Sequence, residues 1–316
     1  MKILTSFNVN PKIQNELIGK FSTVEFSFHG SMKEAMTEID SVEILVSYGG
    51  DLNEEVINKA AKLKWIMVFS AGIEKIPFDA IKQKGILVTN ARGTSKMPMA
   101  EYTIGMILQV ARKTKQLIES EKLEEWNRRL KMIEISGATI TIIGTGSIGS
   151  EIARLAKAFG MKTVGVNRSG RNVEYFDEVY PVTELEKAIG QGDYIVSVLP
   201  STRDTYHLLK DYHFKKMKKT CVFINIGRAS LVDENVLIQA LETGEIAHAV
   251  LDVFETEPLP KGHPFWKMEN VTITPHLSGV SRQYLTRCVE IFEHNLQQYI
   301  SGENNFKNVI DLDRGY

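Results

Sequence analysis

Short apolar runs alternate with amphipathic segments along most of the chain. The runs are rich in Ile and Val, and between most of them apolar residues recur at helical spacing. The expected strands are 2–6, 44–47, 65–69, 87–89, 139–143, 163–166, 194–198, 222–225, 249–252 and 271–273. Strands that alternate with helices indicate βαβ units, and continuously apolar strands are typical of a parallel sheet covered by helices on both faces. The pattern therefore predicts an α/β protein.

The 316 residues suffice for about two domains. The pattern predicts one long helix at 98–121, a charged segment that reaches residue 134, and a last helix at 281–301. We expect one unit at 1–96 and a second at 97–278, with the C-terminal helix of 279–316 returning to the first. The domains would then not be consecutive along the chain.

Composition excludes several classes of protein. Lys and Arg number 38 against 39 Asp and Glu, which argues against nucleic-acid or membrane-surface partners because both need an excess of basic charge. The two cysteines, Cys221 and Cys288, form no disulfide framework and no CxxC metal pair, so we expect no metal site. No signal-peptide pattern and no membrane-spanning apolar stretch is visible, and we expect a cytoplasmic protein.

A glycine-rich turn at 144–149 follows one expected strand and opens a helix. Its glycines are Gly144, Gly146 and Gly149, in the pattern GxGxxG. The first permits a tight turn, the second lets the backbone approach a pyrophosphate, and the third allows close packing of helix on strand. The alternative is a turn without a ligand, but the strand before it and the helix after it favour dinucleotide binding.

The end of the next strand is where a ribose-binding acid is expected. The chain has Asn167, Arg168 and Ser169 there, followed by Arg171, and no Asp or Glu. An acid would bind the 2′-hydroxyl of NAD and repel a 2′-phosphate, whereas an arginine can bind that phosphate. The sequence therefore favours NADP over NAD, unless these arginines are only solvated surface charges.

Three chemically different side chains follow three later strands: Arg228, Glu257 and His276. Reduction of a 2-keto acid needs a cation for the substrate carboxylate, a proton donor for the developing alkoxide, and a carboxylate beside the imidazole. Each residue alone could be an ion pair or a surface charge. Together, downstream of a dinucleotide turn, they predict hydride transfer between NAD(P)H and a small 2-keto or 2-hydroxy acid.

Four segments resemble the D-isomer-specific 2-hydroxyacid dehydrogenase family in order and spacing. They are GTGSIG at 144–149, NIGRASLVDENVLIQAL at 225–241, LDVFETEPL at 251–259 and TPHLSG at 274–279. The resemblance implies that Arg228 binds the carboxylate and polarises the carbonyl, that His276 is the acid/base, and that Glu257 is its partner. It also implies a Rossmann-type doubly wound parallel sheet inserted into a second, flavodoxin-like α/β substrate domain, and a homodimer formed through about 98–130.

The resemblance extends to residues that would contact ligands. The implied substrate-binding residues are Tyr48, Gly49, Ser70, Ala71, Gly72 and Arg228. The implied cofactor-binding residues are Met99, Thr103, Gly144, Gly146, Ser147, Ile148, Gly149, Asn167, Arg168, Ser169, Leu199, Pro200, Thr205, Ile226, Asp252 and Gly279.

Alternatives remain open on the substrate and on the class of protein. Glyoxylate or hydroxypyruvate is the favoured substrate, with phosphoglycerate and D-lactate as runners-up within the family. A corepressor-like protein that senses NAD(H) is the alternative of another class, since the three charged residues do not exclude it. A formate dehydrogenase is disfavoured because those members have Gln where this chain has Glu257.

Overall fold

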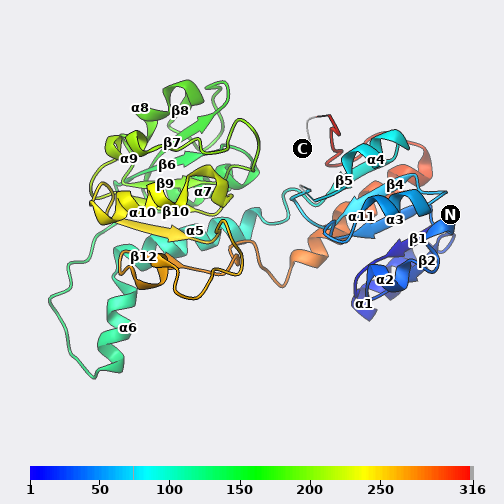
Figure 1. Cartoon of the computed structure of the whole chain (residues 1–316), viewed down its shortest axis with the longest axis horizontal. Coiled ribbons are helices and arrows are strands. Elements are labelled where there is room, and N and C mark those ends of the chain that lie inside the picture. Colours follow the sequence, from blue (N-terminus) through cyan, green and yellow to red (C-terminus); the bar gives the residue numbers. More distant parts are fainter. Residues whose placement is uncertain (74, 314–316) are drawn as a thin grey trace. The chain divides into compact units, whose positions relative to one another are not determined.

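The computed structural model describes residues 1–73 and 75–313 and divides the chain into two compact units. Unit 1 consists of Met1–Thr94 and the chain from Arg282 onward, and unit 2 of Ser95–Ser281 (Figure 1). The two boundaries lie between residues 94 and 95 and between 281 and 282, whereas the predicted boundaries follow residues 96 and 278. The assignment of substrate and cofactor to the two units stays a prediction.

Unit 1 contains a five-stranded parallel sheet in the order β2-β1-β3-β4-β5. The strands are β1 (Lys2–Thr5), β2 (Glu25–Phe28), β3 (Ile44–Ser47), β4 (Trp65–Val68) and β5 (Leu87–Asn90). One face packs against α2 (Met32–Ala35), α3 (Glu54–Lys59) and α4 (Phe78–Gln83). The other face packs against α1 (Pro11–Lys20) and α11 (Tyr284–Ser301).

The last helix, α11, completes the core of unit 1. Phe292 stacks on Trp65 of β4 with ring centroids 5.7 Å apart, and Tyr299 stacks on the same indole at 5.6 Å. Val289 and Leu296 extend the buried stripe at helical spacing. Segments separated by more than two hundred residues therefore share one hydrophobic core.

Unit 2 contains a seven-stranded parallel sheet in the order β12-β11-β10-β9-β6-β7-β8. The strands are β6 (Thr139–Ile143), β7 (Lys162–Asn167), β8 (Glu178–Pro181), β9 (Tyr194–Ser197), β10 (Val222–Asn225), β11 (His248–Leu251) and β12 (Val271–Ile273). Helices α5 (Lys96–Ala111) and α7 (Ser147–Ala158) cover one face. Helices α8 (Leu185–Ile189), α9 (Asp211–Lys216) and α10 (Glu234–Glu242) cover the other. The predicted α/β class with a doubly wound parallel sheet is confirmed.

The prediction of one helix over 98–121 is wrong. Helix α5 ends at Ala111, and α6 (Thr114–Lys122) begins after Lys113, whose φ of +56° is left-handed. A left-handed residue cannot continue a right-handed α-helix, so the chain changes direction there. The buried apolar stripe of α5 ends at the same point, which leaves α6 without a buried residue.

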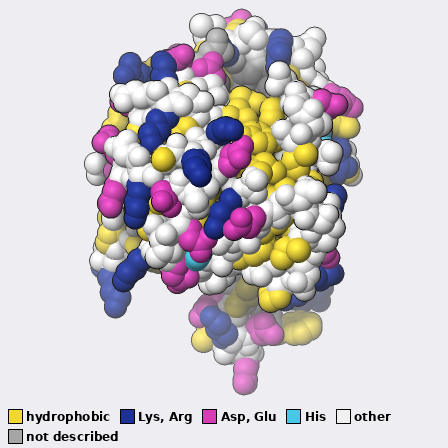
Figure 2. All heavy atoms as spheres, turned by 90° about the vertical axis from the view of Figure 1, so that its right-hand side faces the viewer, with side chains coloured by type: hydrophobic (Ala, Val, Ile, Leu, Met, Phe, Trp, Pro, Cys, Tyr) yellow, Lys and Arg dark blue, Asp and Glu magenta, His cyan; other side chains and the backbone are white. Residues whose placement is uncertain are grey.

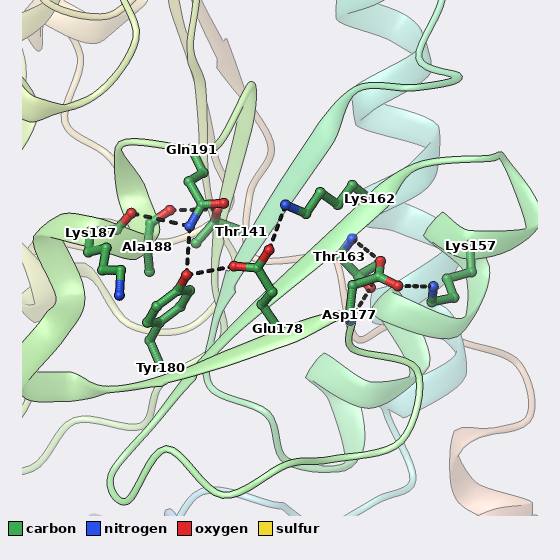
Figure 3. A network of polar contacts seen from close by, with 10 residues as sticks. All are labelled: Thr141, Lys157, Lys162, Thr163, Asp177, Glu178, Tyr180, Lys187, Ala188 and Gln191. Atoms are coloured by element: carbon green, nitrogen blue, oxygen red, sulfur yellow. Dashed lines mark hydrogen bonds and ion pairs between the residues drawn. The ribbon is translucent and has the colours of Figure 1, made fainter.

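The edge of the unit 2 sheet is held by polar side chains (Figure 3). Lys162 lies 2.7 Å from Glu178, and Lys157 lies 2.6 Å from Asp177. Chiefly through these two lysines, the pKa of each carboxyl is lowered from its ordinary value. The carboxylates therefore stabilise the fold above about pH 4, and this contribution is lost as the pH falls through their lowered pKa values. The network secures β7, the strand that leads to Asn167.

Charge is mixed on the surface shown in Figure 2, where Lys and Arg lie among Asp and Glu. This mixture agrees with the formal net charge of −1. Among the described residues, no helix is both long and apolar enough to cross a membrane. The same residues contain no group of three or more His, Cys, Asp or Glu that could hold a metal ion.

Candidate active site

The glycine turn between β6 and α7 leaves room for a phosphate. Gly144 has a φ of +110°, and a Cβ on Gly149 would lie 1.9 Å from the carbonyl oxygen of Gly144. A Cβ on Gly146 would meet nothing within 4 Å, so this position faces open space. Gly146 is also the N-cap of α7 and carries no capping side chain, so the N–H groups of the first helical turn can bind an anion. The turn therefore fits the pyrophosphate of a dinucleotide.

This turn lies where the strand order of the sheet reverses, between β6 and β9. Ligands of open α/β sheets bind at such a switch point. A Cβ on Gly144 would lie 2.9 Å from the Val198 side chain, and one on Gly227 would lie 2.6 Å from the Leu199 carbonyl oxygen. The loops after β6, β9 and β10 are therefore in close contact. Thr205 holds the middle loop, because its hydroxyl donates to the Pro200 carbonyl at 2.6 Å.

Asn167 organises the loop after β7. Its Oδ1 accepts the N–H groups of Ser169 at 3.1 Å and Gly170 at 2.7 Å, and its Nδ2 donates to Thr145 in the glycine turn at 3.1 Å. Arg168, at the exposed tip, lies 3.7 Å from Asp204 of the loop after β9. The structure thus places an arginine, with the carboxylate of Asp204 beside it, at the position where a ribose is expected.

Arg228 follows β10 on a turn that Asn225 holds in place. Asn225 accepts the N–H of Gly227 at 3.2 Å and donates to the Arg228 carbonyl at 3.0 Å. The guanidinium is half-buried and donates to the Gly227 carbonyl at 3.0 Å. Its planar fork of N–H donors matches a carboxylate in two parallel hydrogen bonds.

His276 and Glu257 form a hydrogen-bonded pair. Nδ1 of His276 lies 2.8 Å from one oxygen of Glu257, and the other oxygen accepts the Phe254 N–H at 3.0 Å. The side chains are 51% and 37% exposed, so the pair can be reached from solvent. A carboxylate at Nδ1 orients the ring and supports the imidazolium, which leaves Nε2 as the nitrogen for proton transfer.

Asp252 holds the loop that carries His276. Its fully buried carboxylate accepts the Thr274 hydroxyl at 2.6 Å and the N–H groups of Leu277 at 2.8 Å and Ser278 at 2.9 Å. Its carbonyl oxygen accepts the His276 N–H at 3.0 Å. The family resemblance implies only a contact with the cofactor for Asp252, and this second role was not predicted.

The predicted substrate residues of unit 1 follow two neighbouring strands. Tyr48 and Gly49 follow β3, next to the point between β1 and β3 where the strand order reverses, and Ser70–Gly72 follow β4. Tyr48 is 44% exposed, and its ring centroid lies 4.5 Å from that of Phe7. The carbonyl of Ala71 accepts from the Asn90 side chain at 2.9 Å, which orients the loop after β4. These residues gather where such a sheet binds ligands.

Comparison with known proteins identifies the family. Residues 104–278 match the family model described as the NAD binding domain of D-isomer specific 2-hydroxyacid dehydrogenases. The chain is 33% identical over 283 residues to a glyoxylate reductase of Thermofilum pendens, which covers 86% of this chain and 83% of that protein. The chain belongs to the D-isomer specific 2-hydroxyacid dehydrogenase family.

Two further relatives extend the match over nearly the whole 2-hydroxyacid dehydrogenase chain. A solved structure of a D-isomer specific 2-hydroxyacid dehydrogenase family protein from Aeromonas salmonicida subsp. salmonicida A449 is 35% identical, with a TM-score of 0.90 over 99% of both chains. A D-3-phosphoglycerate dehydrogenase of Methanocaldococcus jannaschii is 33% identical over 300 residues. That match covers 94% of this chain and 57% of the relative, so the chain spans little more than half of that protein's length.

The predicted family is confirmed, and with it an NAD(P)-dependent 2-hydroxyacid dehydrogenase that transfers a hydride. The individual site residues stay predictions. In unit 2 the strands are parallel, and the glycine turn lies at their carboxyl ends. The same ends carry Arg228, Glu257 and His276. Four of the predicted cofactor residues are buried in the interior of unit 2: Thr103, Gly149, Ile226 and Asp252. The Thr103 hydroxyl donates to the Met99 carbonyl at 2.7 Å.

Proposed function

We propose that this 2-hydroxyacid dehydrogenase reduces glyoxylate or hydroxypyruvate and prefers NADPH. The observation that carries the proposal is the His276–Glu257 pair at 2.8 Å. The pair lies at the carboxyl ends of the strands of the unit 2 sheet, where Arg228 and the glycine turn also lie. Homology to the glyoxylate reductase of Thermofilum pendens supports the choice of substrate.

In the proposed reaction the bound nicotinamide supplies a hydride to the carbonyl carbon. His276 gives a proton from Nε2 to the carbonyl oxygen, so that a hydroxyl group forms. Glu257 holds the ring through Nδ1 and stabilises the imidazolium before the transfer. Arg228 binds the substrate carboxylate and polarises the carbonyl, an interaction that strengthens as negative charge develops on the oxygen. Tyr48, Gly49 and the backbone N–H groups of Ser70–Gly72 are the proposed further contacts of the substrate.

A substrate panel tests the proposal. Oxidation of NADPH and of NADH is followed by absorbance with glyoxylate, hydroxypyruvate, pyruvate and larger 2-keto acids. We expect the highest kcat/KM with glyoxylate or hydroxypyruvate. A preference for pyruvate or phosphohydroxypyruvate would support the D-lactate or phosphoglycerate alternative. Absence of turnover, together with cofactor-dependent capture of a protein partner, would instead support the corepressor-like alternative.

Arg168 provides a separate prediction on the choice of cofactor. Arg168→Asp replaces a cation that can pair with a 2′-phosphate by an anion that repels it and can bind the 2′-hydroxyl of NADH. We expect the ratio of kcat/KM for NADPH to that for NADH to fall at least tenfold, which is about 1.4 kcal/mol. Lys219→Asp, an equal charge change at an exposed residue before β10, serves as the control. An unchanged ratio in Arg168→Asp would contradict the phosphate-binding role.

We also propose a homodimer formed through α6 and the segment after it, which extend away from the sheet of unit 2 (Figure 1). The exposed apolar side chains of this part are Leu117, Ile118, Leu123, Trp126, Met132 and Ile133. Trp126 is 92% exposed, and large apolar side chains gathered on one segment mark an interaction surface. Light scattering of the purified protein tests the mass, and a monomer at micromolar concentration would contradict the proposal.

A cytoplasmic location also remains a proposal. It is supported by Cys221 and Cys288, which are buried and form no disulfide bond, as expected in a reducing compartment.

A further inference from the structure

We propose that Tyr102 is a positioning residue for His276, and that it acts through the hydroxyl of Thr274 and the carboxylate of Asp252. The inference rests on the proposed role of His276 as the proton donor. Tyr102 lies on α5, 172 residues before Thr274 in the chain. Helix α5 then positions the proton donor, in addition to the contacts with the cofactor that are predicted for Met99 and Thr103.

The direction of each hydrogen bond in this chain follows from counting hydrogens. The Thr274 hydroxyl lies 2.6 Å from Asp252 Oδ1 and 2.6 Å from the Tyr102 hydroxyl. A carboxylate can only accept hydrogen bonds, so the Thr274 hydroxyl donates its single hydrogen to Asp252. Tyr102 must therefore donate to Thr274. Burial raises the pKa of the Tyr102 phenol to about 12, so the phenol keeps this hydrogen throughout the neutral range.

The loop needs such restraint because His276 has a φ of +54°. A non-glycine residue in the left-handed region is strained, and it persists only where the surroundings hold it there. The His276 N–H is shared between the backbone carbonyls of Asp252 and Thr274, each at 3.0 Å. The Asp252 carboxylate accepts the next two N–H groups, of Leu277 and Ser278. If Asp252 moved, the strain would relax, and His276 would lose its alignment with Glu257.

Thr274 and Tyr102 keep the Asp252 carboxylate in place. Thr274 is the side-chain donor among the three groups bound to that carboxylate, and Tyr102 holds Thr274 from the neighbouring helix. The same helix borders the other end of the loop, since a Cβ on Gly279 would lie 3.3 Å from Ser95 Oγ and 3.9 Å from Met99. Helix α5 and its N-cap residue Ser95 therefore lie next to the loop that carries His276 on both sides of this residue.

Three variants test the inference in the full-length enzyme: Tyr102→Phe, Thr274→Val and Thr274→Ser. We expect kcat to fall about fivefold in Tyr102→Phe and about twentyfold in Thr274→Val, because loss of a buried hydrogen bond is worth roughly that range. Thr274→Ser keeps the hydroxyl and should restore most of the loss. Because Asp252 is also a predicted contact of the cofactor, the KM for NADPH can rise as well, but we expect the larger change in kcat in both loss variants. Tyr212→Phe, at an exposed tyrosine of α9, is the matched control.

Two readouts separate positioning from a general structural effect. NADPH deuterated at the transferred position should show a larger isotope effect on kcat in Tyr102→Phe and Thr274→Val, because misplacement of His276 slows the chemical step. Amide hydrogen exchange of the 274–281 peptide should accelerate in the same two variants, with exchange in the strands unchanged. The second readout requires no turnover.

The outcomes distinguish this inference from the proposed function. If His276→Ala is inactive while Tyr102→Phe and Thr274→Val keep wild-type kcat, the positioning role is refuted. It is also refuted if their losses appear only in the KM for NADPH, or if Thr274→Ser fails to restore activity. If His276→Ala retains wild-type activity, the proposed function fails instead. The exchange of the 274–281 peptide then decides alone whether Tyr102 and Thr274 hold the loop.

Discussion

His276→Ala is expected to lower kcat by 10²- to 10⁴-fold, the usual contribution of a positioned general acid. The reaction leaves negative charge on the carbonyl oxygen unless a proton arrives, and Nε2 of His276 is the donor that the Glu257 contact leaves available. The KM for NADPH should remain near the wild-type value, because the glycine turn and the 167–171 loop, which are proposed to hold the cofactor, do not contain His276 and are unchanged. Steady-state kinetics with glyoxylate and a fluorescence titration with NADPH measure the two quantities.

Glu257→Gln separates the two parts of this pair. The amide has a single oxygen for the two donors, His276 Nδ1 and the Phe254 N–H, and it lacks the charge that stabilises the imidazolium. Because the imidazole itself remains, we expect a smaller loss than in His276→Ala. His294→Ala, at a histidine of α11 that contacts the Asn305 carbonyl, is the control for loss of an imidazole. A kcat in His276→Ala within tenfold of wild type would exclude His276 as the proton donor.

Arg228→Gln is expected to lower kcat/KM for the keto acid about 10³-fold, or roughly 4 kcal/mol, as for loss of a main electrostatic contact with a developing oxyanion. Both kcat and KM for the keto acid should change, because Arg228 is proposed to bind the ground-state carboxylate and to polarise the carbonyl. Arg228→Lys keeps the charge and loses the planar fork, so we expect a partial recovery to within about a hundredfold of wild type.

The turn itself should survive these substitutions. Asn225 bonds to the backbone of Gly227 and of Arg228, so most of the local geometry does not depend on the guanidinium. The melting temperature therefore provides the control, and it should change by only a few degrees. A kcat/KM for the keto acid that stays within tenfold of wild type in Arg228→Gln would contradict the assignment.

The family, the class of fold and the central strands could be predicted from the sequence because each depends on local patterns. The three glycines of the turn are required by a positive φ, by open space and by contact with a carbonyl, and each requirement appears as a glycine at a set spacing. The central strands are apolar on both faces and stand out as continuous runs. The edge strands β2 and β8 carry polar residues and lie outside the pattern, so neither was predicted.

Other features could not be predicted because they depend on distant residues. The break between α5 and α6 occurs at Lys113, which carries no helix-breaking side chain. In the sequence, Thr274 is an ordinary residue at the end of a strand. Its contact with Tyr102 arises only from the packing of α5 in unit 2. The role of Asp252 in the loop follows from three donors that lie more than twenty residues further along the chain.

The return of α11 to unit 1 also bears on the order in which the protein matures on the ribosome. All of unit 2 is contiguous in sequence, so it can finish folding as soon as residue 281 has left the exit tunnel. The first 94 residues emerge earlier but wait with Trp65 and Phe69 uncovered, because the helix that buries them is synthesised only after the whole of unit 2. Unit 1 therefore begins to emerge before unit 2 but is completed after it, and during that interval its exposed apolar residues are the ones that most need a chaperone.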